Sequence, residues 1–214
     1  AKRIGESRRD VMGFTTLSDR LLGSGHPDPL NRNGEPNNVG VIESTDGGRN
    51  WHPVALSGEV DFHALAGAGK TTYGYDGAAG RLMRSTDTAR TWQTVTGINS
   101  VISLAVSPDS SRVLASTAKG VQLSSDSGRS WHTTDNAVGL VAFGPQNAWS
   151  VDGQGTVRQS DANGRRWQTR GSVPGAPVAI TATDNGLVVA LEEGRIMQSY
   201  DNGETFTLRL TLQS

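Results

Sequence analysis

The chain has 214 residues and a formal net charge of −1, so its charge gives no reason to expect a nucleic-acid partner or an anionic membrane surface. It contains no cysteine, which excludes disulfides, thiol catalysis and cysteine-ligated metals. Its 27 glycines and 6% aromatic residues are typical of many short strands joined by tight turns, and no apolar run is long enough to predict a membrane-spanning helix.

The predicted strands follow one another in a regular series. Residues 1–10 are predicted to form an outer strand without partners of its own, and the rest divides into repeats of four strands, A to D, over residues 11–57, 60–98, 100–136, 137–172 and 176–214. The strand runs are short, rich in Val, Leu, Thr and aromatic residues, and bounded by Gly, Asp, Asn and Ser. In the first repeat a long polar insert, Ser24–Asn38, separates strands B and C.

The segment between strands C and D is written five times in the sequence. Its regular form is Ser-x-Asp-x-Gly-x-x-Trp, first as Ser44–Trp51, and its aspartates stand 35 to 41 residues apart. A fixed period of this size indicates a repeat architecture. The residues assigned to this structural turn are Ser44, Asp46, Gly48, Trp51, Ser85, Asp87, Trp92, Ser124, Asp126, Gly128, Trp131, Asp161, Trp167, Ser199, Asp201, Gly203 and Phe206.

The composition of this segment predicts a tight turn. Ser and Asp side chains accept hydrogen bonds from nearby backbone N–H groups, the Gly supplies a backbone angle that other residues reach at a cost, and the aromatic residue opens the next strand and buries its ring. Two copies depart from the form. Ala89 replaces the Gly in the second copy, and the fourth copy has one extra residue before Trp167, which predicts a bulged turn.

The motif resembles the Asp-box, or BNR, repeat of sialidase-like β-propellers, over residues 40–206. The resemblance implies an all-β fold, a single β-propeller domain over residues 1–214, with five four-stranded antiparallel blades in this chain. It also implies a six-bladed parent, in which residues 1–10 are the outer strand of a further blade; closure of that strand onto the fifth blade is the alternative.

Three further segments carry a second resemblance. Leu22–Asp28, Asp61–Leu65 and Tyr73–Asp76 look like a bacterial family labelled glycosyl hydrolase by similarity, whose members are sialidase-like in fold. Those members look secreted or lipid-anchored, which implies an extracytoplasmic location, whether secreted, periplasmic or anchored.

The expected blade geometry predicts where ligands bind. A–B and C–D turns lie on one face of an up-and-down blade, so the opposite face, built from B–C and D–A turns, is free for recognition. The candidate ligand-binding residues on that face are His26, Asp28, Asp61, His63, Tyr75 and Asp76, with Asn31, Arg32, Glu35 and Glu59 close by in the sequence. His52 and His132 each follow a turn Trp on an outer strand and are expected at the surface.

The chemistry of these residues leaves several interpretations open. His26 and His63, with Asp28 and Asp61, suit a glycan or small-molecule ligand, a partner protein, or a divalent metal held by the two imidazoles. No cofactor is required by any motif. A glycoside hydrolase would need two carboxylates, for which Asp61 and Asp76 are candidates with Tyr75 as a nucleophile. The plainer interpretation is that Asp28 caps its own turn and His63 fills an inner strand.

Overall fold

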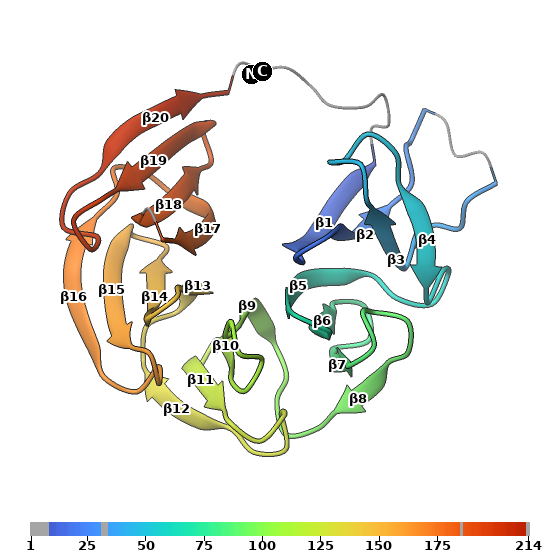
Figure 1. Ribbon diagram of the computed structural model, residues 1–214, viewed down its shortest axis with the longest axis horizontal. Helices are drawn as coiled ribbons and strands as arrows, with labels where there is room; N and C mark the ends of the chain where they lie inside the picture. The colour runs from blue at the N-terminus through green and yellow to red at the C-terminus, as the bar shows by residue number, and fades with distance from the viewer. Residues whose placement is uncertain (1–8, 31–33, 185, 213–214) are drawn as a thin grey trace. The chain divides into compact units, whose positions relative to one another are not determined.

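The computed structural model describes residues 9–30, 34–184 and 186–212, and every regular element within those ranges is a β-strand. The strands, β1 to β20, form five antiparallel sheets of four strands each (Figure 1). Within each sheet the order in space is the order in sequence. This hairpin-connected sheet is the blade of a β-propeller, so the predicted all-β fold with five four-stranded blades is confirmed.

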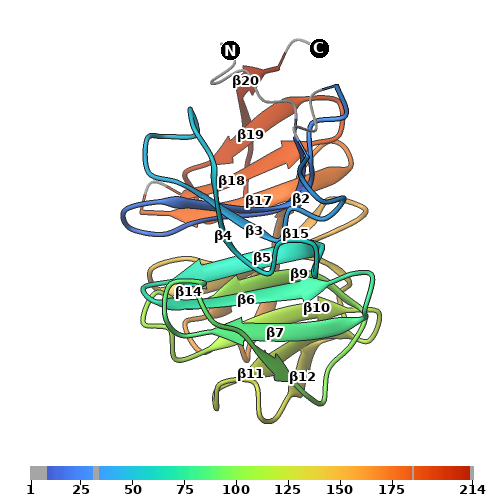
Figure 2. The same cartoon turned by 90° about the vertical axis from the view of Figure 1, so that its right-hand side faces the viewer.

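The chain divides into two compact units, one up to Val101 and one from Ile102. The unit up to Val101 holds two sheets, and Figure 2 shows β5, β6 and β7 of the second one side by side. Its strands are β1 (Asp10–Thr16), β2 (Leu21–His26), β3 (Val41–Ser44) and β4 (His52–Ala55), then β5 (Phe62–Ala68), β6 (Thr71–Asp76), β7 (Arg81–Ser85) and β8 (Gln93–Val95).

The unit from Ile102 holds the other three sheets, apart from the first residue of β9. Their strands are β9 (Val101–Val106), β10 (Val113–Thr117), β11 (Gly120–Ser124), β12 (His132–Asp135); β13 (Gly139–Phe143), β14 (Asn147–Asp152), β15 (Thr156–Asp161), β16 (Trp167–Ser172); β17 (Pro177–Thr183), β18 (Gly186–Leu191), β19 (Arg195–Ser199) and β20 (Thr207–Thr211).

The start of the chain differs from the prediction. Asp10 was expected in an unpartnered outer strand, but it opens β1 and lies opposite His26 of β2. The cause is that β1 pairs with β2 along its length, with one irregularity after Val11. Residues 1–8 of the expected outer strand lie outside the described residues.

Hydrophobic clusters lie between consecutive sheets in each unit. Leu22 of the first sheet packs in one cluster with Phe62 of the second. In the other unit, one cluster joins the sheets β9–β12 and β13–β16, and another joins β13–β16 and β17–β20. The second strands β6 and β10 are buried along their whole length, because both faces of such a strand are covered. Removal of this apolar surface from water is the main stabilising term.

Ser and Thr hydroxyls reinforce the same sheet-to-sheet packing. The N–H of Phe62, at the start of β5, donates to Ser24 Oγ on β2 over 3.0 Å, and this bond is buried. Equivalent bonds of 3.1 Å run from Gly67 N to Thr15 Oγ1, from Val141 N to Ser103 Oγ and from Gly139 N to Ser116 Oγ. Each one supplies an acceptor to a backbone N–H of the following sheet's inner strand.

The repeated turn has the hydrogen bonds that its composition predicts. In the third copy, Ser124 Oγ accepts from Gly128 N over 2.9 Å and donates to Asp126 Oδ1 over 2.8 Å. The Asp126 carboxylate also accepts from the N–H and hydroxyl of Ser130. The indole N–H of Trp131 donates to the carbonyl of Gly128. The same set recurs in the copy led by Asp87, in the copy led by Asp46 with the Asn50 side-chain amide in place of the hydroxyl, and without the indole bond in the copy led by Asp201.

The two departures have different outcomes. Ala89 adopts the left-handed backbone of the glycine it replaces, with φ of 65°, which costs an L-residue roughly 1–2 kcal/mol, while its methyl group is buried in the hydrophobic cluster. In the fourth copy, Gly164 keeps the left-handed position four residues after the Ser and three before the Trp, whereas Asp161 directly follows Ser160, and Ser160 Oγ accepts from Arg166 N. The sheet still closes, with Ser160 opposite Trp167.

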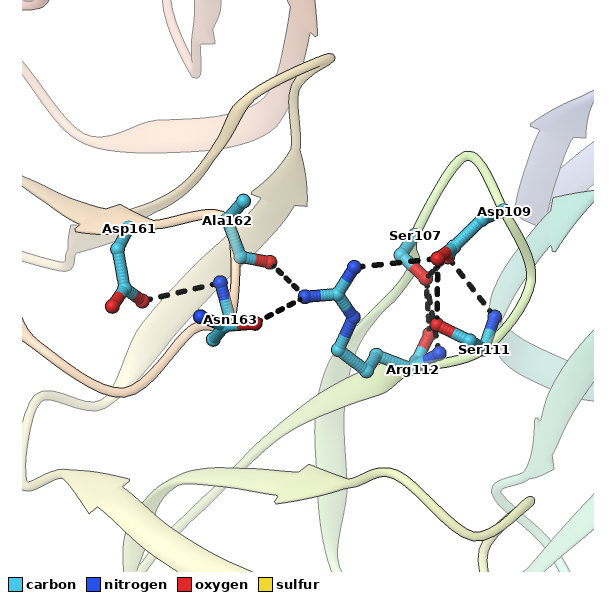
Figure 3. Close-up of polar contacts among 7 residues, drawn as sticks. All are labelled: Ser107, Asp109, Ser111, Arg112, Asp161, Ala162 and Asn163. Carbon is cyan, nitrogen blue, oxygen red and sulfur yellow. Dashed lines mark hydrogen bonds and ion pairs between the residues drawn. The ribbon is translucent and has the colours of Figure 1, made fainter.

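An additional turn of similar chemistry joins β9 to β10. The Asp109 carboxylate accepts from the Ser107 hydroxyl and from Ser111, while Arg112 of the same turn reaches Ala162 O and Asn163 Oδ1 in the β15–β16 turn (Figure 3). In the other unit, Thr88 N donates to Lys70 O. Within each unit these bonds connect an A–B turn to a C–D turn at the same end of the sheets, as predicted.

Replacing Ser24 by alanine is expected to lower the free energy of unfolding by about 1–3 kcal/mol, because the buried N–H of Phe62 then has no acceptor. Denaturant titration measures this effect. Ser150→Ala is the matched control, since Ser150 occupies the equivalent place on β14 and its buried hydroxyl has no partner within the described residues. An equal loss of unfolding free energy in the two variants would contradict the stabilising role of the Phe62 N–H to Ser24 Oγ hydrogen bond.

Stability is expected to fall between pH 4 and pH 2. Hydrogen bonds from the Ser130 hydroxyl and N–H, followed by the Ser124 hydroxyl, lower the pKa of Asp126 to about 2. A carboxyl whose pKa is lower in the folded state stabilises the fold above its ordinary pKa, and this contribution is lost as the pH falls through the folded value. Asp126→Asn should therefore flatten the fall in denaturant midpoint over this range, whereas Asp184→Asn, an exposed site outside the repeated turns, should not.

Candidate functional site

His26, Asp61 and His63 meet at one point in the unit up to Val101. His63 Nε2 lies 2.8 Å from Asp61 Oδ2, and His26 Nε2 lies 3.4 Å from the same oxygen. The side chain of His26 is 42% exposed and that of His63 is 47% exposed, whereas the Asp61 side chain is 8% exposed. Two solvent-facing imidazoles therefore cover one buried carboxylate, and the predicted grouping of His26 with His63 is observed.

Local backbone features place each of the two histidines. His26 is the last residue of β2 and follows Gly25, whose φ is 149° and whose Cα faces the Asp10 carbonyl so closely that a Cβ would lie 2.0 Å from that oxygen. His63 lies in a β-bulge of β5, because Phe62 pairs with Asp76 and Ala64 with Tyr75. Bulges redirect side chains next to sites, and this one places His63 over Asp61.

Asp61 is the group that the rest of the fold leaves least satisfied. Its Oδ2 faces the two imidazoles, while its Oδ1 is buried and has no hydrogen-bond partner in the described part of the chain. Its backbone carbonyl accepts from Gly77 N over 3.1 Å, which connects the loop before β5 to the β6–β7 turn. A buried carboxylate oxygen without a donor is costly, so this position stands apart from an ordinary turn carboxylate.

The other candidate residues have structural partners. Asp28 accepts from Leu30 N over 2.9 Å and so caps its own turn. Asp76 is 1% exposed, accepts from Ala79 N and forms an ion pair with Arg81 at 3.2 Å. The Asp28 contact matches the plainer interpretation of that residue, whereas Asp76 is buried in its ion pair.

Tyr75 and the two nearby glutamates are likewise placed by the structure. The buried Tyr75 hydroxyl accepts from Ser100 N over 2.9 Å, in the loop before β9. Glu35 forms an ion pair with Arg9, and Glu59 is exposed. Asn31 and Arg32, also proposed from the sequence, lie outside the described residues.

Metal binding and membrane insertion can be considered for the same part of the chain. No group of three or more His, Cys, Asp or Glu among the described residues is arranged to hold a metal ion, so the metal interpretation of His26 and His63 gains no support there. No helix in the described ranges could cross a bilayer. His52 and His132 are both exposed on outer strands, as predicted.

Three contributors to the site were missed by sequence reasoning. The carbonyl of Asn37 lies 2.9 Å from His26 Nδ1. Gly77 lies against the His63 ring, where a Cβ would be 2.7 Å from Nδ1. Asp10, exposed, is opposite His26 in the β1–β2 register. A backbone carbonyl and a glycine carry no residue-type signal, whereas Asp10 was missed because it was assigned to the separate segment 1–10 and not to the strand that pairs with β2.

The fold and site define a β-propeller protein with a histidine–carboxylate cluster at the loop ends opposite its repeated turns. No protein-family model matches the sequence, and no curated protein matches it. Solved structures do match. One is titled "YCF48 bound to D1 peptide", with a TM-score of 0.60 and 15% identity, covering 98% of this chain and 69% of that one.

Two other matches come from proteins of different function. A chain of a nidogen/laminin complex has a TM-score of 0.69 and 11% identity, covering 88% of this chain and 75% of that one. The GH74 xyloglucanase of Xanthomonas campestris has a TM-score of 0.65 and 16% identity, covering 98% of this chain and 32% of that one. Identities this low establish the shared β-propeller fold alone.

Gly77→Ala is expected to displace the His63 ring from Asp61 without unfolding the protein. The new Cβ would lie 2.7 Å from His63 Nδ1, closer than nonbonded atoms allow, and the exposed ring can move away at a cost below about 1 kcal/mol. The change is read as a shift of the His63 imidazole signal in NMR spectra. Gly153→Ala is the matched control, because Gly153 follows Asp152 as Gly77 follows Asp76 and a Cβ there meets nothing within 4 Å. An unmoved His63 signal in Gly77→Ala would contradict the geometry.

Proposed function

We propose that this chain is an Asp-box propeller that acts as a recognition module, binding a peptide or partner protein through the surface around His26, Asp61 and His63. The observation that carries the proposal is the buried Asp61 carboxylate, which has one oxygen shared by two half-exposed imidazoles and the other without a donor among the residues that the structure describes. Such polar groups are costly to a fold that does not use them. Their place on loops held by rigid sheets suits recognition.

The carboxylate contacts favour binding over hydrolysis. A glycoside hydrolase needs two carboxyl groups facing one open space, one of them free to donate a proton. Of the candidates, Asp76 is buried against Arg81 and a backbone N–H, and Asp28 caps its turn. Tyr75 has its hydroxyl directed to Ser100 N. Asp61 is therefore left without a second catalytic carboxylate among these candidates.

The structural neighbours are compatible with preferring protein or peptide binding over glycoside hydrolysis. One neighbour's title describes a bound peptide and another a protein complex, so propellers of this shape can present protein-binding surfaces. The GH74 neighbour keeps glycoside hydrolysis as the alternative function. An extracytoplasmic location, drawn from the family resemblance, belongs to the same proposal.

The test uses the whole chain and two assays. A displayed library of random peptides is selected on the immobilised protein, and the enriched peptides are synthesised and titrated against purified protein. His63→Ala is expected to weaken their binding at least about tenfold, or about 1.4 kcal/mol. His132→Ala, at an exposed histidine on β12, is the matched control and should bind as the original chain does.

In parallel, hydrolysis of aryl glycosides, including a sialoside and a xyloglucan-type substrate, is measured.

The outcomes separate the two functions. Peptide binding that is lost in His63→Ala supports recognition at this surface. Enriched peptides that bind His63→Ala unchanged would refute it. Saturable hydrolysis that disappears in Asp61→Asn would replace the proposal with the hydrolase alternative.

A further inference from the structure

The His26–Asp61–His63 cluster contains more acceptors than donors. His26 Nδ1 lies 2.9 Å from the Asn37 carbonyl oxygen, and a carbonyl can only accept, so Nδ1 is assigned the hydrogen. A neutral imidazole carries a single N–H. In the neutral form of His26 the Nε2 lone pair then faces Asp61 Oδ2 at 3.4 Å, so two acceptors stand opposite each other.

His63 and Asp61 add to this excess. The N–H of His63 is assigned to Nε2, which donates to Asp61 Oδ2 over 2.8 Å, so Nδ1 of the neutral ring is an acceptor as well. Asp61 Oδ1 has no donor within the described residues, and its side chain is 8% exposed. His63 Nδ1 lies on the Gly77 side of the ring, away from Asp61. With both rings neutral, the acceptors that face one another are therefore His26 Nε2 and Asp61 Oδ2, and the carboxylate keeps one negative charge.

The charged groups that the structure describes near the cluster do not neutralise it. Asp10, exposed and opposite His26, adds a second carboxylate. Of the described basic side chains in the adjoining segments, Arg9 pairs with Glu35 and Arg81 pairs with Asp76. A group that brings positive charge and several hydrogens is what this arrangement lacks.

We infer that the cluster binds a primary ammonium group of a partner protein, either a lysine side chain or a chain's amino terminus. An ammonium group is a compact charge with three donors and no acceptor, so a single ammonium group can donate to both His26 Nε2 and Asp61 Oδ2. Hydrogen bonds from a cation to such acceptors are stronger than neutral ones. This inference rests on the proposed function and specifies the ligand chemistry of the same surface.

The four histidines of the chain provide a direct measurement. Protein labelled with ¹³C at the imidazole Cε1 is titrated with three probes: lysine capped at both ends, equally capped norleucine, and Gly-Gly amide. The His26 and His63 signals are expected to shift saturably with an ammonium probe, with a dissociation constant on the order of 1 mM for so small a ligand. The exposed His52 and His132 signals should stay in place.

Variants connect the shifts to the cluster. Asp61→Asn is expected to weaken ammonium binding at least about tenfold. Gly77→Ala, which moves His63 without altering a buried charge, should also weaken it, and keeps the test open if Asp61→Asn folds poorly. Asp184→Asn removes an exposed carboxylate elsewhere in the chain and should bind as the original does.

Each outcome of the titration either supports or overturns the inference. Saturable binding of capped lysine alone assigns a side chain as the source, and binding of Gly-Gly amide alone assigns an amino terminus. Equal shifts with norleucine, no saturable shift, or unchanged binding in both site variants would overturn the inference. Library peptides that need His63 but show no preference for an ammonium group would overturn it as well, while leaving the proposed recognition function intact.

Discussion

Every buried backbone N–H in a fold of short strands and tight turns must find an acceptor, and in this protein short polar side chains meet much of that requirement. Ser124 and Asp126 accept from the N–H groups of a turn, while Ser24 accepts from the first residue of the next sheet. The hydrophobic clusters between sheets supply most of the stabilising free energy. The hydroxyl and carboxylate contacts add direction, because they fix where each turn closes and where a following inner strand lies.

That division of roles explains why the two ends of the sheets differ. At one end, serine and aspartate side chains are fully engaged in turn hydrogen bonds, and Arg112 joins two such turns. At the other end the loops vary in length, and most of their acids are also engaged, as Asp28 and Asp76 are. Asp61 differs from those two carboxylates, because its partners are two imidazoles that solvent can reach.

The sequence predicted the fold well because the turn chemistry is local. Five copies of one Ser–Asp turn establish the period, the sheets and the end at which His26 and His63 gather. The site was harder to predict, since its geometry depends on contacts distant in the chain. Asp61 and Asp76 look alike in sequence, yet only one of them has an arginine partner, and the Asn37 carbonyl has no residue-type signature. The turn at Ser107 and Asp109, in contrast, repeats the Ser-x-Asp spacing and could have been found.

The bulge at His63 determines which side chains near the start of β5 can be substituted. Downstream of it, β5 keeps its register with β6 and buries Leu65 in the cluster that stabilises the unit. Upstream, Val60 and Phe62 belong to the same cluster, so the position that can be exchanged is His63 itself, whose side chain is 47% exposed. A substitution at residue 63 can therefore alter the surface over Asp61 while the packed residues on either side of the bulge stay in place.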